Sequence, residues 1–248
     1  MRERDSELEG TLRFMSIRNI KSVSLFEDTN QDIDAVHPCR IHDGYDLNQS
    51  TITPNRVNRM ATMLPMDQWL AKLSLNLECL SMSFVSDAKF FFRAVEPVWI
   101  WNDLEQLSLT SHVLRPVSHP DNPNDLLIAA AHAALRMSRL RIMELWYTEP
   151  EATGTTGYAG VFRYQRVSKM VCTITWDGTW SLPLEPSVVQ AWNEVALTYT
   201  EFDIRVREDR RDAGWMDCRG DAIKFLGLQD HVVSQTSLEH MVIEAIPR

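Results

Sequence analysis

Apolar residues recur every three to four positions in four segments of the chain, the spacing of a helix with one buried face. Three of these segments begin at a proline or a capping residue, and the fourth ends at Gly227. The pattern therefore predicts helices over residues 54–64, 125–137, 186–196 and 221–226.

Elsewhere apolar and polar residues alternate one by one, which is the period of a strand with one solvated face. This alternation covers residues 170–176 and 202–207, and residues 158–164 are expected to pair with the first of these as an antiparallel hairpin. Residues 66–76 fit either a helix or a strand.

A recurring Leu-x-x-Leu-x-Leu pattern organises the rest of the sequence. Leucine-rich repeats use this pattern for the short strand that each unit adds to a curved parallel sheet. The stricter form, in which a charged residue follows the first Leu, is expected on the order of 0.5 times from composition. It occurs five times, at Leu12, Leu77, Leu104, Leu140 and Leu238, and a related unit begins at Ile20.

The spacing of these units indicates an irregular array. Leu77 and Leu104 are 27 residues apart, within the usual repeat length, whereas the next gap of 36 residues holds the helix predicted over 125–137. That helix supplies the crossover that parallel strands require. The asparagine of regular repeats is missing, because Val85, His112 and Thr148 stand at its places.

We therefore predict an α/β fold of leucine-rich-repeat-like type. It is an irregular solenoid with a curved, mainly parallel sheet, crossover helices and a β-hairpin insertion near the C-terminal end. The chain is expected to form a single domain over 1–248, in which residues 1–11 are flexible and the polar residues 27–53 form a long surface loop.

Residues between the apolar positions of each unit are expected on the open, concave side of the sheet. The predicted binding face is polar with one aromatic anchor, which suits recognition of another protein. It comprises Ser81, Ser83, Gln106, Ser108, Thr110, Glu144, Trp146 and His240. The alternative is that these small residues let a further layer of the fold pack over the sheet.

Charge and composition narrow the class of partner. The 248 residues carry a net charge of −9, which opposes binding to nucleic acid, and only nine glycines are present for loops that hold nucleotide phosphates. The charged N-terminus lacks an apolar signal segment, and no apolar run is long enough to span a membrane. We expect a cytoplasmic or nuclear protein that has no cofactor and whose partner is a protein.

Candidate chemistry is sparse. His37, Cys39 and His42 have metal-binding side chains but no fourth ligand, so no metal site is predicted, and the motifs of serine hydrolases and zinc proteases are absent. Arg205, Arg207, Arg210 and Arg211 are interleaved with acids, which is typical of a solvated face. An alternative to protein recognition is an enzyme or small-molecule binder with a pocket lined by Trp146, Trp176 and Trp180.

Five runs of sequence carry a family resemblance: LEQLSLTSH (104–112), AAHAALRMSRLRIMELW (130–146), VFRY (161–164), TITW (173–176) and LEPSVVQAW (184–192). In these runs the chain resembles a family of uncharacterised fungal proteins related to F-box/leucine-rich-repeat proteins. The resemblance covers most of the chain from about Leu12 onward. It implies a repeat region that holds a target, while an F-box docks a ubiquitin-ligase adaptor. The short, charged N-terminus shows no F-box, so we expect a non-catalytic recognition module of leucine-rich-repeat-like type that lacks its F-box.

Overall fold

The computed structural model describes residues 20–27, 67–116, 121–149, 157–212, 216 and 218–244. Several sequence predictions fall outside these residues and are not tested by the structure. They are the flexible segment 1–11, the unit at Leu12, the surface loop after residue 27, the helix over 54–64, and the metal candidates His37, Cys39 and His42.

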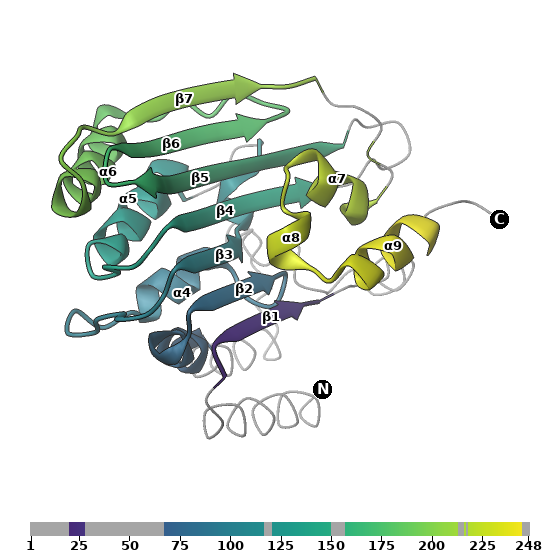
Figure 1. Cartoon of the computed structure of the whole chain (residues 1–248). Coiled ribbons are helices and arrows are strands. Elements are labelled where there is room, and N and C mark those ends of the chain that lie inside the picture. The colour runs from purple at the N-terminus through teal and green to yellow at the C-terminus, as the bar shows by residue number, and fades with distance from the viewer. Residues whose placement is uncertain are drawn as a thin grey trace, which may run out of the picture.

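One seven-stranded sheet, with its strands in chain order, forms the centre of the fold (Figure 1). Strands β1 to β4 run parallel, β5 is antiparallel to both of its neighbours, and β7 is parallel to β6. The strands are β1 (Ser22–Phe26), β2 (Cys79–Ser83), β3 (Gln106–Thr110), β4 (Ile142–Glu149), β5 (Tyr158–Ser168), β6 (Val171–Gly178) and β7 (Arg205–Arg210). The predicted mixed α/β fold with a mainly parallel part is confirmed.

The predicted units give rise to the parallel strands with one common offset. Strands β1, β2, β3 and β4 each begin two residues after the first residue of a unit, at Ile20, Leu77, Leu104 and Leu140. The charged second residue of each unit stands immediately before its strand. The same local structure is therefore repeated four times, at the end of the sheet where the four parallel strands begin.

The backbone at this charged position joins one unit to the next. The carbonyl of Lys21 accepts hydrogen bonds from the amides of Glu78 and Cys79, at 2.7 and 3.0 Å. The carbonyl of Glu78 accepts in the same way from residues 105 and 106, and that of Glu105 from residues 141 and 142. Each carbonyl thus fixes the register of the following strand.

The prediction that Leu238 begins a further parallel strand is wrong, and so is the strand position given to His240. Both residues lie in helix α9 (Gln235–Glu244). Leu238, Met241 and Val242 recur at helical spacing, and the Ser234 hydroxyl accepts a hydrogen bond from the Ser237 amide, as a helix N-cap does. The cap and the spacing outweigh the resemblance to the strand pattern.

Helices cover both faces of the sheet (Figure 1). Helices α4 (Ala88–Ala94), α5 (Pro123–Ala134) and α6 (Pro186–Tyr199) lie on one face, called here the helix-layer face. Helices α7 (Arg219–Phe225), α8 (Gln229–Val232) and α9 lie on the other, called the cover face. Residues 67–73 are also helical and lead into the 3-10 turn η1 (Ser74–Asn76), which settles the ambiguous segment, and a second such turn is η2 (His112–Leu114).

Two hydrophobic cores result from this arrangement. The larger, on the helix-layer face, joins side chains such as Leu107, Leu145 and Phe162 to Trp192 of α6. The smaller, on the cover face, joins Trp146 to the apolar residues of α7 and α8. Strand β4 is therefore buried on both sides, as parallel strands with helices on both faces usually are.

The other predicted elements are confirmed with shifted ends. Helices α5, α6 and α7 match the predicted segments, and β5 and β6 form the predicted hairpin with a two-residue connection at 169–170. Strand β7 begins at Arg205 rather than at Phe202, because residues 202–204 bond to α6 instead of β6. The Phe202 amide donates to the Thr200 hydroxyl, and the Ile204 amide donates to the Asn193 side-chain oxygen at 2.8 Å.

Asp87 supports a testable prediction about the helix layer. Its carboxylate caps α4 through the Lys89 amide, and it also accepts from the Ser111 hydroxyl and the His112 amide, at 2.7 and 2.8 Å. The variant Asp87→Ala should lose about 2 to 4 kcal/mol of unfolding free energy in urea, because one change removes a cap and two hydrogen bonds to a charge. The control Asp103→Ala removes only an exposed ion pair with Arg139 and should lose less than about 1 kcal/mol. Equal losses in the two variants would contradict this role.

Candidate functional site

The structure places most of the predicted binding residues on one face of the sheet. Ser81 pairs with Ser108, Ser108 with Glu144, and Thr110 with Trp146, so these side chains share the cover face. They are not exposed, however. The most exposed of the six, Thr110, is only 6% accessible, and the others are Ser81, Ser83, Ser108, Glu144 and Trp146.

The expected open concave face is therefore covered at these positions. Helix α7 lies over β4 and β5, and α8 lies over β1 and β2. The small serines allow α8 to approach the sheet closely, and the Ser24 hydroxyl of β1 donates to the Val232 carbonyl of α8 at 3.1 Å. The alternative drawn from the sequence, a further layer packed over small residues, describes this part of the molecule. Gln106 stays half-exposed, and His240 is exposed on α9.

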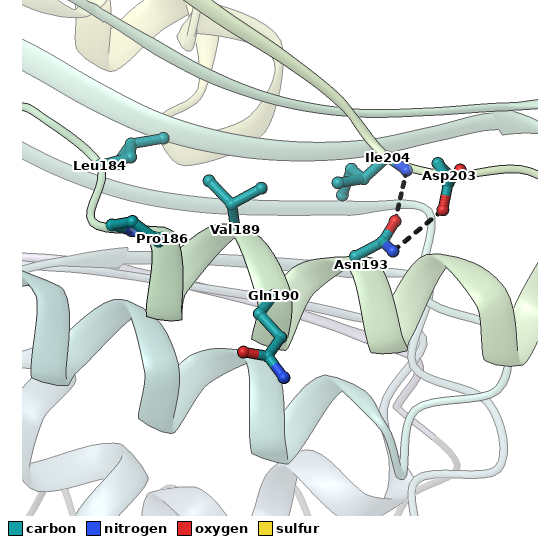
Figure 2. A pocket seen from close by; sticks show the side chains of 7 residues that line it. All are labelled: Leu184, Pro186, Val189, Gln190, Asn193, Asp203 and Ile204. Atoms are coloured by element: carbon teal, nitrogen blue, oxygen red, sulfur yellow. Dashed lines mark hydrogen bonds between the residues drawn. The ribbon is translucent and has the colours of Figure 1, made fainter.

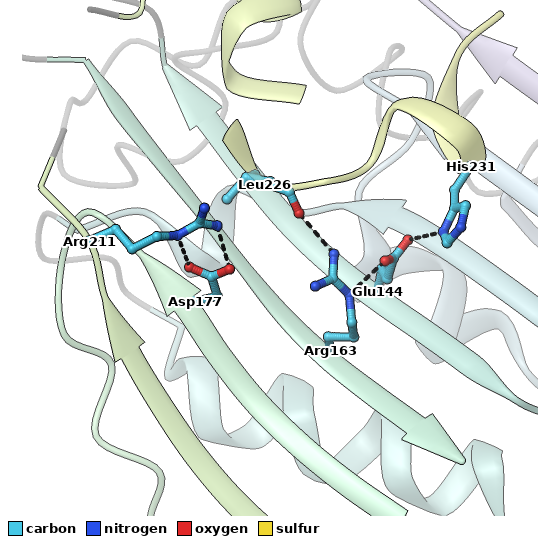
Figure 3. Close-up of polar contacts among 6 residues, drawn as sticks. All are labelled: Glu144, Arg163, Asp177, Arg211, Leu226 and His231. Carbon is cyan, nitrogen blue, oxygen red and sulfur yellow. Dashed lines mark hydrogen bonds and ion pairs between the residues drawn. The ribbon is translucent and has the colours of Figure 1, made fainter. Parts of the chain in front are cut away.

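A buried carboxylate links the sheet to its cover (Figure 3). Glu144 of β4 has no exposed surface and accepts from Nε of Arg163 on β5 at 2.8 Å. Its other oxygen lies 3.2 Å from Nδ1 of His231 on α8. Arg163 also donates to the Leu226 carbonyl, which follows α7, at 2.9 Å. The cluster ties β4 and β5 to both α7 and α8.

His231 is adapted to the protonated state by this cluster. The hydrogen bond to Glu144 raises the pKa of His231 above its usual value of 6.5, and the charge of Glu144 adds to this effect. Burial of the ring, the second-largest influence, and the charge of Arg163 lower the pKa, but they do not cancel the effect of the hydrogen bond and the charge of Glu144. A protonated His231 shares with Arg163 the task of neutralising a carboxylate that is out of contact with water.

A second ion pair supports the same cover (Figure 3). Arg211 forms a bidentate ion pair with Asp177 of β6. Its Nε donates to one carboxylate oxygen at 2.6 Å, and its Nη2 donates to the other. The guanidinium also lies over the ring of Phe225 in α7, at 4.3 Å from the ring centre. Arg211 thereby links Asp177 of the sheet to Phe225 of α7.

Closure of the cover leaves several polar atoms without partners. Within the described residues, the hydroxyls of Ser81, Ser83 and Ser108 and the Trp146 Nε1 are buried and unbonded. Each such atom costs about 1 to 3 kcal/mol. The cover face also buries apolar side chains, including Ile223, Leu226, Leu228, Val232 and Leu238, at a gain of about 1.5 to 3 kcal/mol for each larger one.

The three tryptophans of the alternative pocket do not converge. Trp146 pairs with Val161 and Trp176 with Phe162, which are consecutive residues of β5 and point to opposite faces. Trp176 and Trp180 lie together on the helix-layer face, with ring centres 5.2 Å apart. Trp146 instead contacts Phe84 on the cover face. A single pocket lined by all three is therefore absent.

A groove is open at the far edge of the helix layer (Figure 2). It has a volume of about 560 Å³ and lies between α6 and the segment that leads into β7. Its lining combines apolar and polar side chains, and it comprises Leu184, Pro186, Val189, Gln190, Asn193, Asp203 and Ile204. Asn193 donates to Asp203 at 3.0 Å, which joins the two sides of the groove.

Exposed apolar side chains extend this groove along the edge of the sheet. Leu197, Phe202 and Val206 are each about half-exposed, at 45 to 54%. We call the groove together with these three residues the α6–β7 surface. The sequence pattern predicts a helix and an alternating strand here. It does not predict this surface, because a local pattern does not show that none of the described helices covers β7.

The family of unknown function DUF6546 matches residues 15–234. The chain belongs to this family. Comparison with curated proteins and with solved structures gives no match. The DUF6546 match spans the sheet, the groove and the Glu144 cluster, so all of them lie within the family region.

Two classes of feature are missing from the described part of this DUF6546 chain. No three side chains among its described His, Cys, Asp and Glu residues lie close enough together to hold a metal ion. None of its described helices is both long enough and apolar enough to cross a membrane.

The Glu144 cluster generates a prediction about pH. Because the pKa of His231 is raised on folding, its protonation stabilises the fold fully below pH 6.5, and this contribution is lost as the pH rises through the folded-state pKa. The unfolding free energy of the wild type in urea should therefore fall more between about pH 6 and about pH 9 than that of His231→Asn.

His132→Asn is the matched control for this experiment, since His132 is exposed on α5. Its pH dependence should equal that of the wild type. If His231→Asn also follows the wild-type curve, protonated His231 does not hold the cover.

Proposed function

We propose that this protein is a non-catalytic recognition module that binds another protein through the α6–β7 surface. The observation that carries the proposal is the half-exposed apolar set at this edge, beside an open groove of about 560 Å³. Clustered exposed apolar side chains with a polar rim are characteristic of protein-binding surfaces.

The apolar side chains of this surface come from two elements. Val189 and Leu197 stand on α6, which is packed against α5 and the sheet through Trp192. Phe202 and Val206 stand on the connection to β7 and on β7 itself. A preformed helix lowers the ordering cost of binding, so this surface can provide affinity from modest buried area.

We also propose a leucine-rich-repeat-like character for the part from β1 to β4. Its support is the shared offset of the four units and the repeated use of the carbonyl at the charged position. Under this proposal the repeats serve as a rigid scaffold. The partner binds at the α6–β7 surface and not on the cover face. Membership of an F-box-like adaptor stays a prediction from the family resemblance.

The alternative, an enzyme or small-molecule binder with a tryptophan-lined pocket, has less support. Its three residues lie on two faces of the sheet. The buried charge of Glu144 and the partly exposed charge of Asp177 are engaged in holding α7 and α8 to the sheet. These contacts explain both charges without a substrate.

The proposal is tested by affinity capture from the native source with three baits, followed by mass spectrometry. The baits are the wild type, the surface variant Val189→Ser with Val206→Ser, and the control Val98→Ser with Ile100→Ser. The control residues are also exposed apolar side chains, but they lie in the loop after α4. A protein recovered with the wild type and the control, and reduced about tenfold or more with the surface variant, is expected.

Equal recovery with all three baits, or no specific protein with any of them, would overturn the proposal. Trp146→Ala is unsuitable as a test of binding, because Trp146 is fully buried and its loss should cost about 3 to 5 kcal/mol of stability.

A further inference from the structure

We infer that the partner of the α6–β7 surface presents a basic amphipathic helix to the groove. This inference rests on the proposed function and specifies the chemistry of its partner. Two observations carry it independently: a layer of described helices that does not extend over β7, and a stretch of sequence around α6 that contains acidic but no basic side chains.

Among the described residues, the helix layer ends before strand β7 at the edge of the sheet. Helices α5 and α6 lie side by side, and α6 packs on β5 through the contacts of Trp192 with Phe162 and Tyr164. No described helix follows α6 over β7. Val206 pairs with the buried Ile174 and so points to the helix-layer face, yet it is 46% exposed.

The space beside α6 is bounded by two walls and is open to solvent. One wall is the outer side of α6 at Val189 and Asn193, and the other is formed by Asp203 and Ile204. Amphipathic helices bind in such grooves by placing an apolar stripe against apolar walls. Leu184 and Ile204 supply apolar contacts at the two ends of the groove.

The backbone and amide groups around the groove are largely satisfied. The Ile204 amide donates to Asn193, and the Asn193 amide donates to Asp203. Apolar contact and the charge of the carboxylates are therefore the main interactions left for a partner.

The charge around the groove is acidic. Residues 170–204 contain no Lys or Arg, although they contain Glu185, Glu194, Glu201 and Asp203 in the part around α6. On β7 the helix-layer face carries Glu208 and Arg210, and the opposite face carries Arg205, Arg207 and Asp209, so both faces of this strand have mixed charge. The carboxylates around α6 are therefore what favours a basic partner.

The test uses a synthetic amphipathic helix of leucine and lysine, labelled with a fluorophore and titrated with the full-length protein. Fluorescence anisotropy should show saturable binding that weakens with salt, and hydrogen exchange should show protection in residues 184–206. A peptide with glutamate in place of lysine should bind at least about tenfold more weakly.

A charge-matched pair of variants separates the groove from the net charge. The variant Glu194→Lys with Asp203→Lys should weaken binding of the lysine peptide about tenfold. The control Glu96→Lys with Glu239→Lys changes the net charge equally at exposed sites on the loop after α4 and on α9, and it should bind like the wild type. Thermal unfolding of each variant confirms that it is folded. The milder Asp203→Asn keeps an acceptor for Asn193 and should weaken binding about threefold.

Equal weakening in both double variants, or protection outside residues 184–206, would overturn the inference. The proposed function would still stand if a captured protein depended on Val189 and Val206 but not on Glu194 and Asp203. If recovery of the captured protein depended on neither pair of residues, the proposed function would be wrong as well.

Discussion

The register of the parallel strands is the constraint from which the rest of this structure follows. One carbonyl in each unit, at Lys21, Glu78 and Glu105, accepts from two successive amides of the next unit. This fixes the alignment of β1 to β4, and a shift of one residue would turn every side chain to the opposite face. The charged side chains at these positions add little, since the Lys21–Glu78 and Arg141–Glu105 pairs are long and exposed. These polar side chains keep the start of each unit in solvent, while the backbone hydrogen bonds determine the register of the strands.

Once the register is set, the two faces of the sheet have different chemistry. Leu80, Leu107 and Met143 form a row on the helix-layer face, and Ser81, Ser108 and Glu144 form the adjacent row on the cover face. The apolar row favours large helices with interlocking side chains. The polar row admits short helices at close range, but only if the Glu144 charge is neutralised. Arg163 comes from the strand that reverses direction, and His231 comes from the cover itself, so a buried charge specifies where α8 rests.

Much of this architecture could be predicted from sequence, where local pattern and fold agree. The Leu-charged motif located β2, β3 and β4, and Pro123 and Pro186 marked the starts of α5 and α6. The same motif failed at Leu238, because the cap at Ser234 and the spacing to Met241 favour a helix. The cover face could not be predicted as covered, since Ser81 and Ser108 suit both an open surface and a packed one. Whether these serines are exposed or covered depends on where α7 and α8 pack. Those helices lie more than a hundred residues later in the chain, so no local pattern can predict it.

The composition of β7, the last strand of the sheet, disfavours extension of the sheet by a strand of another chain. All six residues of β7 are exposed, and five of them are charged. Such a strand resists pairing with a strand of another chain, because each added strand must bring its own side chains beside these charges. A partner is then better accommodated on a face than along the edge. The cover face there presents Arg205, Arg207 and Asp209, whereas the helix-layer face presents Val206, over which no described helix lies. Under the proposed function, the charged edge favours association through the side chains of the α6–β7 surface, where a helix can bury the apolar residues that the described helices leave exposed.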